Sequence, residues 1–351
     1  MPILALLLAF LAIQSPDAFP PLGIIDFYGL RTVPEAQILQ ALPYHMDDSI
    51  SVEQFKSQKH ALEQKLASLP GVSGAYLTLV CCTVDRKSIL YVGIEESNTP
   101  CQKFLPAPTS GVRLTEDVLS DGRDFEVAFQ KSILKGNFAE DDSQGHALDL
   151  DPDVRAIQLR FVVLADTQLA HLKDVLHNSS DGQQRALAAQ VLGYVKDKQA
   201  IVPDLVAAMR DPEPDVRNNS TRALLIFAEF SPKAPAQKIK ISPRPFIELL
   251  NSCIWSDRNK SSGALAQLTE KGDPALLAEI RNQALPSLLE MASWKYLGHA
   301  RYSLMILGRI GGLTDAAIQK DLDQGNRARV ITAAQEVAKH TRAINKSTPQ
   351  I

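Results

Sequence analysis

Apolar residues recur at helical spacing through the second half of the chain. The pattern is clearest over residues 181–230, where an arginine follows each acidic turn. After Arg185, small or apolar residues come three, six and seven positions later, as Ala188, Val191 and Leu192. Positions with these offsets lie on one face of a helix. The pattern therefore predicts helices that each pack through a single face.

The same frame returns along the chain, so the sequence is predicted to be repetitive. Its first positions are spaced by 30 to 41 residues, at Arg155, Arg185, Arg217, Arg258, Leu297 and Arg327. Periods of that length are typical of stacked helical hairpins. We therefore expect a mainly α fold, with an α-solenoid over residues 151–343.

Within one copy, a Pro-x-Leu element, an acidic turn and a Val-Arg pair follow one another. They are Pro203-Asp204-Leu205, Asp211 and Asp215-Val216-Arg217. Other copies keep the Pro-x-apolar element, as in Pro245-Phe246-Ile247. The arrangement resembles HEAT-like repeats. The resemblance implies a non-catalytic scaffold that binds protein partners along its concave surface.

Before the repeats, strand-like and helix-like stretches alternate. The predicted elements, in order, are a strand at 24–28, helices at 34–42 and 51–69, and a hairpin of 72–84 and 89–96. This order predicts a small α+β domain, βααββ, over residues 20–97. A linker with one helix is expected over 98–150, and a disordered tail over 344–351.

Three features of the first domain are more specific. Gly29 follows the first strand, Pro70-Gly71-Val72 joins the second helix to the next strand, and Glu95-Glu96 ends the last strand. In this order they resemble a POTRA domain. The resemblance implies a protein of a cell envelope that binds polypeptide by strand addition.

The first residues bear on location. An uninterrupted apolar run covers residues 3–13, too short to span a bilayer but right for the core of a secretory signal. We therefore expect a signal peptide over residues 1–19, and a mature protein in a bacterial periplasm or outside the cell. No other stretch is apolar enough to cross a membrane, so membrane association is expected to be peripheral at most.

Charge and cysteine placement add two expectations. The formal net charge of −3 provides no general attraction for nucleic acid, so no nucleic-acid partner is expected. Cys81 and Cys82 are adjacent in a predicted strand, and Cys101 lies well beyond the hairpin, which does not suggest a disulfide framework. We expect the cysteines to be buried as small apolar side chains.

An acidic segment around His146 is the main candidate for chemistry. His146 follows Asp141 and Asp142, a set that suits a hydrolase or a metal-dependent enzyme. A single histidine, without a second one at ligand spacing, instead favours a local hydrogen bond where the linker meets the repeats. The nearby Asp149-x-Asp151-x-Asp153 run lacks the glycine and the final glutamate of a calcium loop. No cofactor, metal or catalytic site is expected, and the enzyme is kept as the alternative.

The repeat frame also predicts a binding surface. Offsets of five and nine from the first position point away from the core, and there the sequence mixes arginine, tyrosine and aliphatic residues, as interaction surfaces do. The residues concerned are Arg160, Gln190, Tyr194, Arg222, Ile226 and Tyr302, with His299 beside them. The alternative for the frame's own arginines, such as Arg217, is that they pair with acids between repeats.

Overall fold

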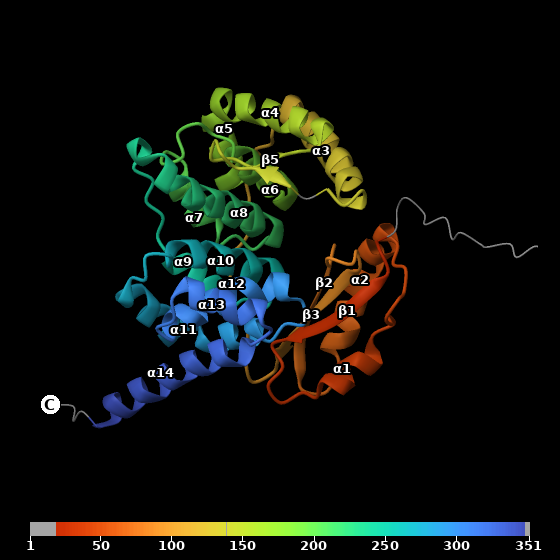
Figure 1. Ribbon diagram of the computed structural model, residues 1–351. Helices are drawn as coiled ribbons and strands as arrows, with labels where there is room; N and C mark the ends of the chain where they lie inside the picture. Colours follow the sequence, from red (N-terminus) through yellow and green to blue (C-terminus); the bar gives the residue numbers. More distant parts are fainter. Residues whose placement is uncertain (1–18, 138, 348–351) are drawn as a thin grey trace, which may run out of the picture.

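The computed structural model describes residues 19–137 and 139–347, which form a helical array with a small mixed sheet beside it (Figure 1). The predicted signal peptide, apart from Phe19, lies outside these residues, as do the last four of the predicted tail. The first four residues of that tail belong to the final helix. None of the helices in the described part of the chain is both long and apolar enough to cross a membrane.

The N-terminal domain has the predicted strand–helix–helix–strand–strand order. Its elements are β1 (Leu22–Tyr28), α1 (Glu35–Ala41), α2 (Val52–Ala67), β2 (Val72–Val80) and β3 (Ser88–Glu96). The strand β3 lies in the centre, parallel to β1 and antiparallel to β2. Ser51 caps α2 by accepting a hydrogen bond from the Gln54 N–H at 3.4 Å.

The central strand is covered on both faces. Leu90, Val92 and Ile94 pack in one apolar core with α1 and α2, whereas Ile89 and Tyr91 belong to the core of the repeats. Successive side chains of a strand point to opposite faces, so one strand serves both cores. Its near-continuous apolar sequence is typical of a strand that is buried on both sides.

A single loop after β1 explains two of the motif residues of this domain. Gly29 has φ +85°, and a Cβ atom there would lie 2.0 Å from the Ile94 carbonyl oxygen. The loop then turns its Arg31, Thr32 and Val33 N–H groups onto the carboxylate of Glu96, at 2.6 to 2.8 Å. The glycine and the acidic strand end therefore hold the same corner.

The rest of the described chain is helical, apart from one short hairpin. Its elements are α3 (Glu116–Leu134), β4 (Glu140–Asp141), β5 (Leu148–Asp149), α4 (Pro152–Thr167), α5 (Leu169–Asn178), α6 (Gly182–Leu192), α7 (Val202–Ala208), α8 (Pro214–Phe230), the 3-10 turns η1 (Ser231–Lys233) and η2 (Pro235–Gln237), α9 (Arg244–Leu249), α10 (Trp255–Leu268), α11 (Pro274–Ala292), α12 (Leu297–Ile310), α13 (Asp315–Asp323) and α14 (Arg327–Ser347).

These helices form two rows. The helices α6, α8, α10, α12 and α14 pack side by side, and we call them the inner row. The helices α5, α7, α9, α11 and α13 each pack against the inner helix that follows them in sequence. Every first position of the repeat frame lies in the first turn of an inner helix or of α4, so the predicted helical phase is confirmed.

Buried arginines join successive repeats. Arg185 forms two hydrogen bonds with Asp211, at 2.7 and 2.8 Å, and Arg217 lies 2.9 Å from Asp257. Arg258 continues the series with Glu290 at 2.6 Å. Each of these three arginines reaches an acid of the following repeat, so pairing between repeats is the correct interpretation for them, whereas Arg155 pairs with Asp141 of the β4–β5 hairpin. We call these three pairs the arginine ladder.

The segment before the repeats is packed rather than free. The Leu105 N–H donates to the Arg210 carbonyl at 2.9 Å, and the Phe104 ring lies 3.6 Å from the Arg217 guanidinium. The helix α3 is continuous through Gly122. A Cβ atom on Gly122 would lie 2.5 Å from Leu187, so the glycine allows α3 to approach the repeats closely.

The expectation for the cysteines is wrong. The structure joins Cys81 to Cys82, and Cys101 to Cys253 with a Cα–Cα separation of 5.8 Å. The second pair spans 152 residues and links the segment after β3 to the repeats. Only the docking of the N-terminal domain brings these two cysteines together, so local spacing could not reveal them.

The sheet docks on the start of α10 and on the segment that joins α11 to α12. The Tyr28 hydroxyl donates to the Cys253 carbonyl at 2.9 Å, and Lys295 donates from its ammonium to the Ile25 carbonyl at 2.6 Å. Tyr91 stacks on Trp255, with ring centroids 5.1 Å apart. The repeats therefore contact the sheet through its aromatic side chains and at the Ile25 carbonyl of β1.

Candidate functional site

A cavity of about 330 Å³ opens on the inner row beside the β4–β5 hairpin. Three successive inner helices, α8, α10 and α12, contribute side chains, and the hairpin closes one side. The lining residues are Glu140, Asp142, Ala147, Arg222, Leu225, Ile226, Glu229, Asn259, Lys260 and Tyr302. We call this space the inner-row cavity.

Helical spacing places the cavity residues opposite the core. In α8, Arg222, Ile226 and Glu229 are four and three positions apart and share a face, whereas Leu224 is fully buried between the rows. On the next helix, Gly263 has no side chain, so Leu225 and the Tyr302 ring lie over it. A Cβ atom there would be 3.3 and 3.5 Å from them.

The hairpin contributes carboxylates that the repeats neutralise in part. Glu140 pairs with Arg222, and Asp142 lies 3.7 Å from the Lys233 ammonium. Burial raises the pKa of Glu229, and the neighbouring Asp142 charge raises it further. The acidic side of the cavity therefore has lower negative charge than its composition suggests.

Lys260 differs from the other basic groups of the cavity. Within residues 19–137 and 139–347, its ammonium has no hydrogen-bond or ion-pair partner. Burial lowers the pKa of Lys260 to about 8, and repulsion from Arg222 adds to this effect. At neutral pH the side chain is still mostly cationic, and the Glu140 carboxylate, which forms its own ion pair with Arg222, favours that cationic form.

The structure brings three of the predicted binding residues together. Arg222, Ile226 and Tyr302 come from α8 and α12 and line the same cavity. Ile226 is only 9% exposed, so it forms a wall of the cavity rather than part of an open ridge. Gln190 lies partly exposed on α6 and does not line this cavity.

The other predicted residues have partners within the chain. Arg160 forms an ion pair with Asp121 of α3 at 2.8 Å. Tyr194 is 7% exposed, because the hairpin covers it and its ring packs against His146. The expectation that Tyr194 lies on an open surface is therefore wrong, because the hairpin that covers it is distant in the repeat frame.

His299 belongs to the interface with the N-terminal domain. Its Nδ1 lies 2.8 Å from the Tyr91 hydroxyl, and Trp255 and Tyr296 pack around the ring. Burial lowers the pKa of His299 to about 4, and the Lys260 charge contributes in the same direction. The docked sheet therefore contacts this predicted residue.

The residues of the alternative enzyme do not form one cluster. His146 is buried, with Nδ1 at 3.3 Å from the Lys198 ammonium, and burial together with that charge lowers its pKa to about 4. Asp141 pairs with Arg155 at 3.1 Å, and Asp142 faces Lys233 and Glu229. Among the described residues, no group of three or more histidines, cysteines or acids could hold a metal ion.

The sequence argument missed the most unusual residue of the cavity. Lys260 stands two positions after Arg258, and His299 stands two positions after the first position of its own repeat. The offset that placed His299 beside the predicted surface would therefore also have selected Lys260. Glu140 and Asp142 could not be found in this way, because they come from the hairpin outside the repeat frame.

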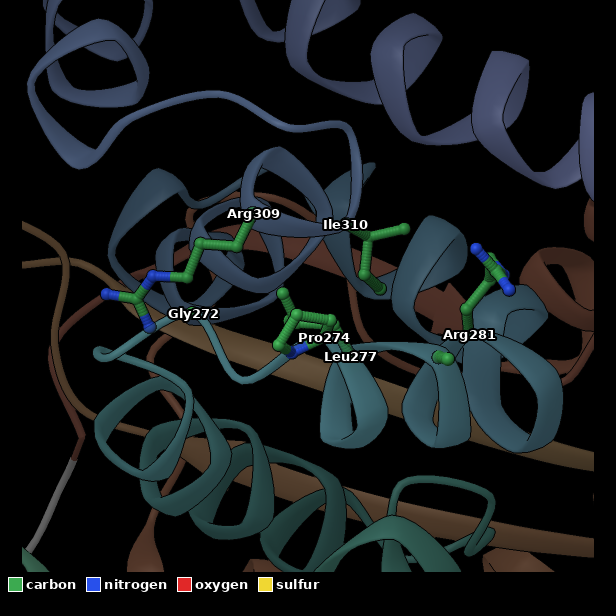
Figure 2. A pocket seen from close by; sticks show the side chains of 7 residues that line it. Gly272, Pro274, Leu277, Arg281, Arg309 and Ile310 are labelled. Carbon is green, nitrogen blue, oxygen red and sulfur yellow. The ribbon is translucent and has the colours of Figure 1, made fainter.

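A second cavity, of about 310 Å³, lies between α11 and α12 (Figure 2). Pro274, Leu277 and Ile310 form its apolar part, and the side chains of Arg281 and Arg309 extend at its two ends. Arg309 is held by Asp315 at 2.8 Å. Because it contains no residue of the predicted surface, this cavity is the weaker candidate.

The comparisons with known proteins agree with the repeat pattern. Residues 169–237 match the HEAT repeats family. This segment includes α5 to α8, two arginines of the ladder, and Arg222 and Ile226 of the inner-row cavity. No curated protein matches the chain. Residues 169–237 are thus HEAT repeats, and they indicate a helical scaffold of the kind that binds proteins.

Proposed function

We propose that this protein is an exported, non-catalytic scaffold of the bacterial cell envelope that binds a polypeptide in the inner-row cavity. The observation that supports it best is the cavity itself. It joins side chains of three successive repeats, with aliphatic and aromatic walls beside charged groups. That mixture is typical of sites that recognise another polypeptide.

The partners of the acidic segment support a scaffold over an enzyme. Asp141 and Asp142 face basic side chains of the repeats, and His146 is buried against Lys198. A general base needs access to a substrate proton within hydrogen-bond distance. The hairpin thus has a structural task, which is to close one side of the cavity.

Two features support export. The apolar run at residues 3–13 has the length of a secretory signal core. The pairing of all four cysteines suits an oxidising compartment. Export with cleavage is tested by the intact mass of protein produced in its host, which is expected to lack about 15–19 residues. A full-length mass in the cytoplasm would contradict export.

The N-terminal domain is proposed to be POTRA-like. The strand order β1-β3-β2, the positive φ of Gly29 and Gly71, and the loop held by Glu96 support this assignment. Strand addition at β1 is blocked by Lys295 of the repeats. Any added strand would therefore pair with β2, where Glu63 already accepts a hydrogen bond from the Leu77 N–H at 2.8 Å.

Site-specific photo-crosslinking tests where a polypeptide binds. A photoreactive amino acid is placed at Tyr302 in the cavity, at Ser73 on the edge strand β2, and at Lys320 on the outer helix α13 as a control. In host envelope extract, we expect polypeptide adducts from position 302 and none from position 320. Adducts from position 73 alone would show that the sheet edge is the binding site. Equal labelling at all three would reject a specific site.

A further inference from the structure

The inner-row cavity contains three carboxylates and two basic groups, and the basic groups differ in how they are paired. Arg222 is neutralised by Glu140, and Lys233 faces Asp142 at the cavity rim. In the described part of the chain Lys260 has no hydrogen bond or direct ion pair, and the Glu140 carboxylate that favours its charged form is already bound by Arg222. A partly buried ammonium without a counter-ion is costly, and a bound carboxylate would remove that cost.

The walls around Lys260 suit the aliphatic stem of an amino-acid side chain. Leu225 and Ile226 line one side, and the Tyr302 ring lies across Gly263 from Leu225. The neighbouring Asn259 has a buried Oδ1 that accepts no hydrogen bond from the described residues. The site thus offers one cation, apolar walls and an amide with unused hydrogen-bonding capacity.

A singly charged group fits better than a phosphate. Phosphate sites usually combine several donors, often a bidentate arginine, and here Arg222 is already engaged by Glu140. Glu140, Asp142 and Glu229 also line the cavity, and they repel a dianion more strongly than a single carboxylate. At about 330 Å³, the space lies at the small end of the range for binding pockets, which suits a side chain rather than a folded element.

We infer that the inner-row cavity binds an acidic side chain of a partner polypeptide, with Lys260 as the group that pairs with its carboxylate. Leu225, Ile226 and Tyr302 contact the stem of that side chain. This inference rests on the proposed function and adds to it the type of segment that is recognised: an extended segment with an aspartate or a glutamate beside apolar residues.

The test uses the full-length mature chain and a phage-displayed library of random linear peptides. Selections are run in parallel on wild type, Lys260→Met, Lys260→Arg and Lys271→Met. Lys271 is exposed on the turn before α11, so Lys271→Met is a matched control for the loss of one charge. Helical signal and melting temperature are compared first, so that only folded variants are used.

Wild type, Lys260→Arg and Lys271→Met are expected to enrich peptides with one recurrent acidic position, and Lys260→Met is not. The leading peptide is then synthesised with capped ends, together with its Glu→Gln or Asp→Asn counterpart. Wild type is expected to bind the amide peptide about tenfold more weakly, as for loss of a charged hydrogen bond. Lys260→Met is expected to bind both peptides equally.

Two outcomes would overturn the inference, and they differ in what else they reject. If selected peptides show no acidic preference, or if Lys260→Met keeps that preference, the carboxylate assignment is wrong while polypeptide binding stands. If wild type selects no peptide at all, the proposed function fails together with the inference.

Discussion

At the residue scale, Glu96 shows how one side chain can fix a loop. It is 1% exposed, and its carboxylate accepts hydrogen bonds from three consecutive N–H groups and from the Thr32 hydroxyl. Burial alone would raise the pKa of Glu96, but these hydrogen bonds outweigh it and lower the pKa to about 2. The ionised form is therefore the one that the fold stabilises.

This gives a prediction for stability against pH. Because the folded pKa lies below the unfolded value of 4.5, the stabilisation is complete above pH 4.5 and is lost as pH falls toward 2. Glu96→Gln is expected to lower the free energy of unfolding by about 2–3 kcal/mol at pH 7. Urea unfolding should show that the deficit shrinks by about 1 kcal/mol at pH 3.5. The same deficit at both pH values would contradict this account.

The sequence indicated Glu96 only as the acidic end of a strand. Its role depends on the loop after Gly29, which the positive φ of that glycine turns back onto the strand end. The inner-row cavity also contains a residue whose role depends on a distant part of the chain. Helical offsets predicted that Arg222 and Tyr302 share a surface, but the charge state of Lys260 depends on burial and on Glu140, which comes from a distant hairpin.

At the scale of the elements, the arginine ladder connects hairpins that have little sequence in common. Arg217 is 1% exposed and Asp257 is fully buried. Arg217 also donates to the Asp211 carbonyl at 2.8 Å and lies beneath the Phe104 ring. One arginine therefore joins its own turn, the next repeat and the segment that follows the first domain.

Removing one partner of this pair should cost more than removing both. Arg217→Met leaves the Asp257 carboxylate buried without its counter-ion, and about 3–5 kcal/mol of stability is expected to be lost. In the double variant with Asp257→Leu, most of that loss should be recovered, because no buried charge remains unpaired. Chemical denaturation followed by circular dichroism measures both. A double variant that is as unstable as Arg217→Met would show that packing, not charge, dominates here.

The repeat frame was predictable because its signal is local. Three offsets from one arginine define a helical face, and each first position lies in the first turn of its helix. The acid that each arginine reaches was not predictable, because Asp211, Asp257 and Glu290 stand at different distances along the chain. All three acids lie in the repeat that follows their arginine, and only the stacking of the helices brings each acid to that arginine.

At the scale of the whole molecule, the ladder continues into the N-terminal domain. Glu290 holds Arg258 with one carboxylate oxygen, and with the other it accepts hydrogen bonds from the Gly29 N–H and from Arg31. Tyr28 lies under the Arg258 guanidinium, 4.8 Å from the ring centroid. The Glu290 carboxylate therefore links the arginine ladder to the loop after β1. No local sequence pattern predicts this contact. Residues 20–97 were therefore expected to form a domain separate from the repeats.

The docking interface should weaken in acid. His299 lies between Tyr91 and two further aromatic rings, and its pKa of about 4 is below the ordinary value of 6.5. For a base whose folded pKa is lowered, the unfolded chain binds more protons, so stability falls as pH decreases from 6.5 to 4. His299→Gln cannot take up this proton. Between pH 6.5 and 4, the free energy of unfolding is therefore expected to fall less in His299→Gln than in wild type, by at most about 3 kcal/mol.

The measurement is the free energy of unfolding at pH 7.0, 5.5 and 4.5 for wild type, His299→Gln and His45→Gln. His45 is exposed at the surface of the first domain, so His45→Gln controls for the loss of an imidazole outside the interface. His146, which is also buried, remains in all three proteins and cancels in the comparison. If only His299→Gln shows a shallower pH dependence than wild type, the acid sensitivity arises at the interface. Three parallel curves would instead place the acid sensitivity in the repeats, with His146 and Lys198 as the groups to change next.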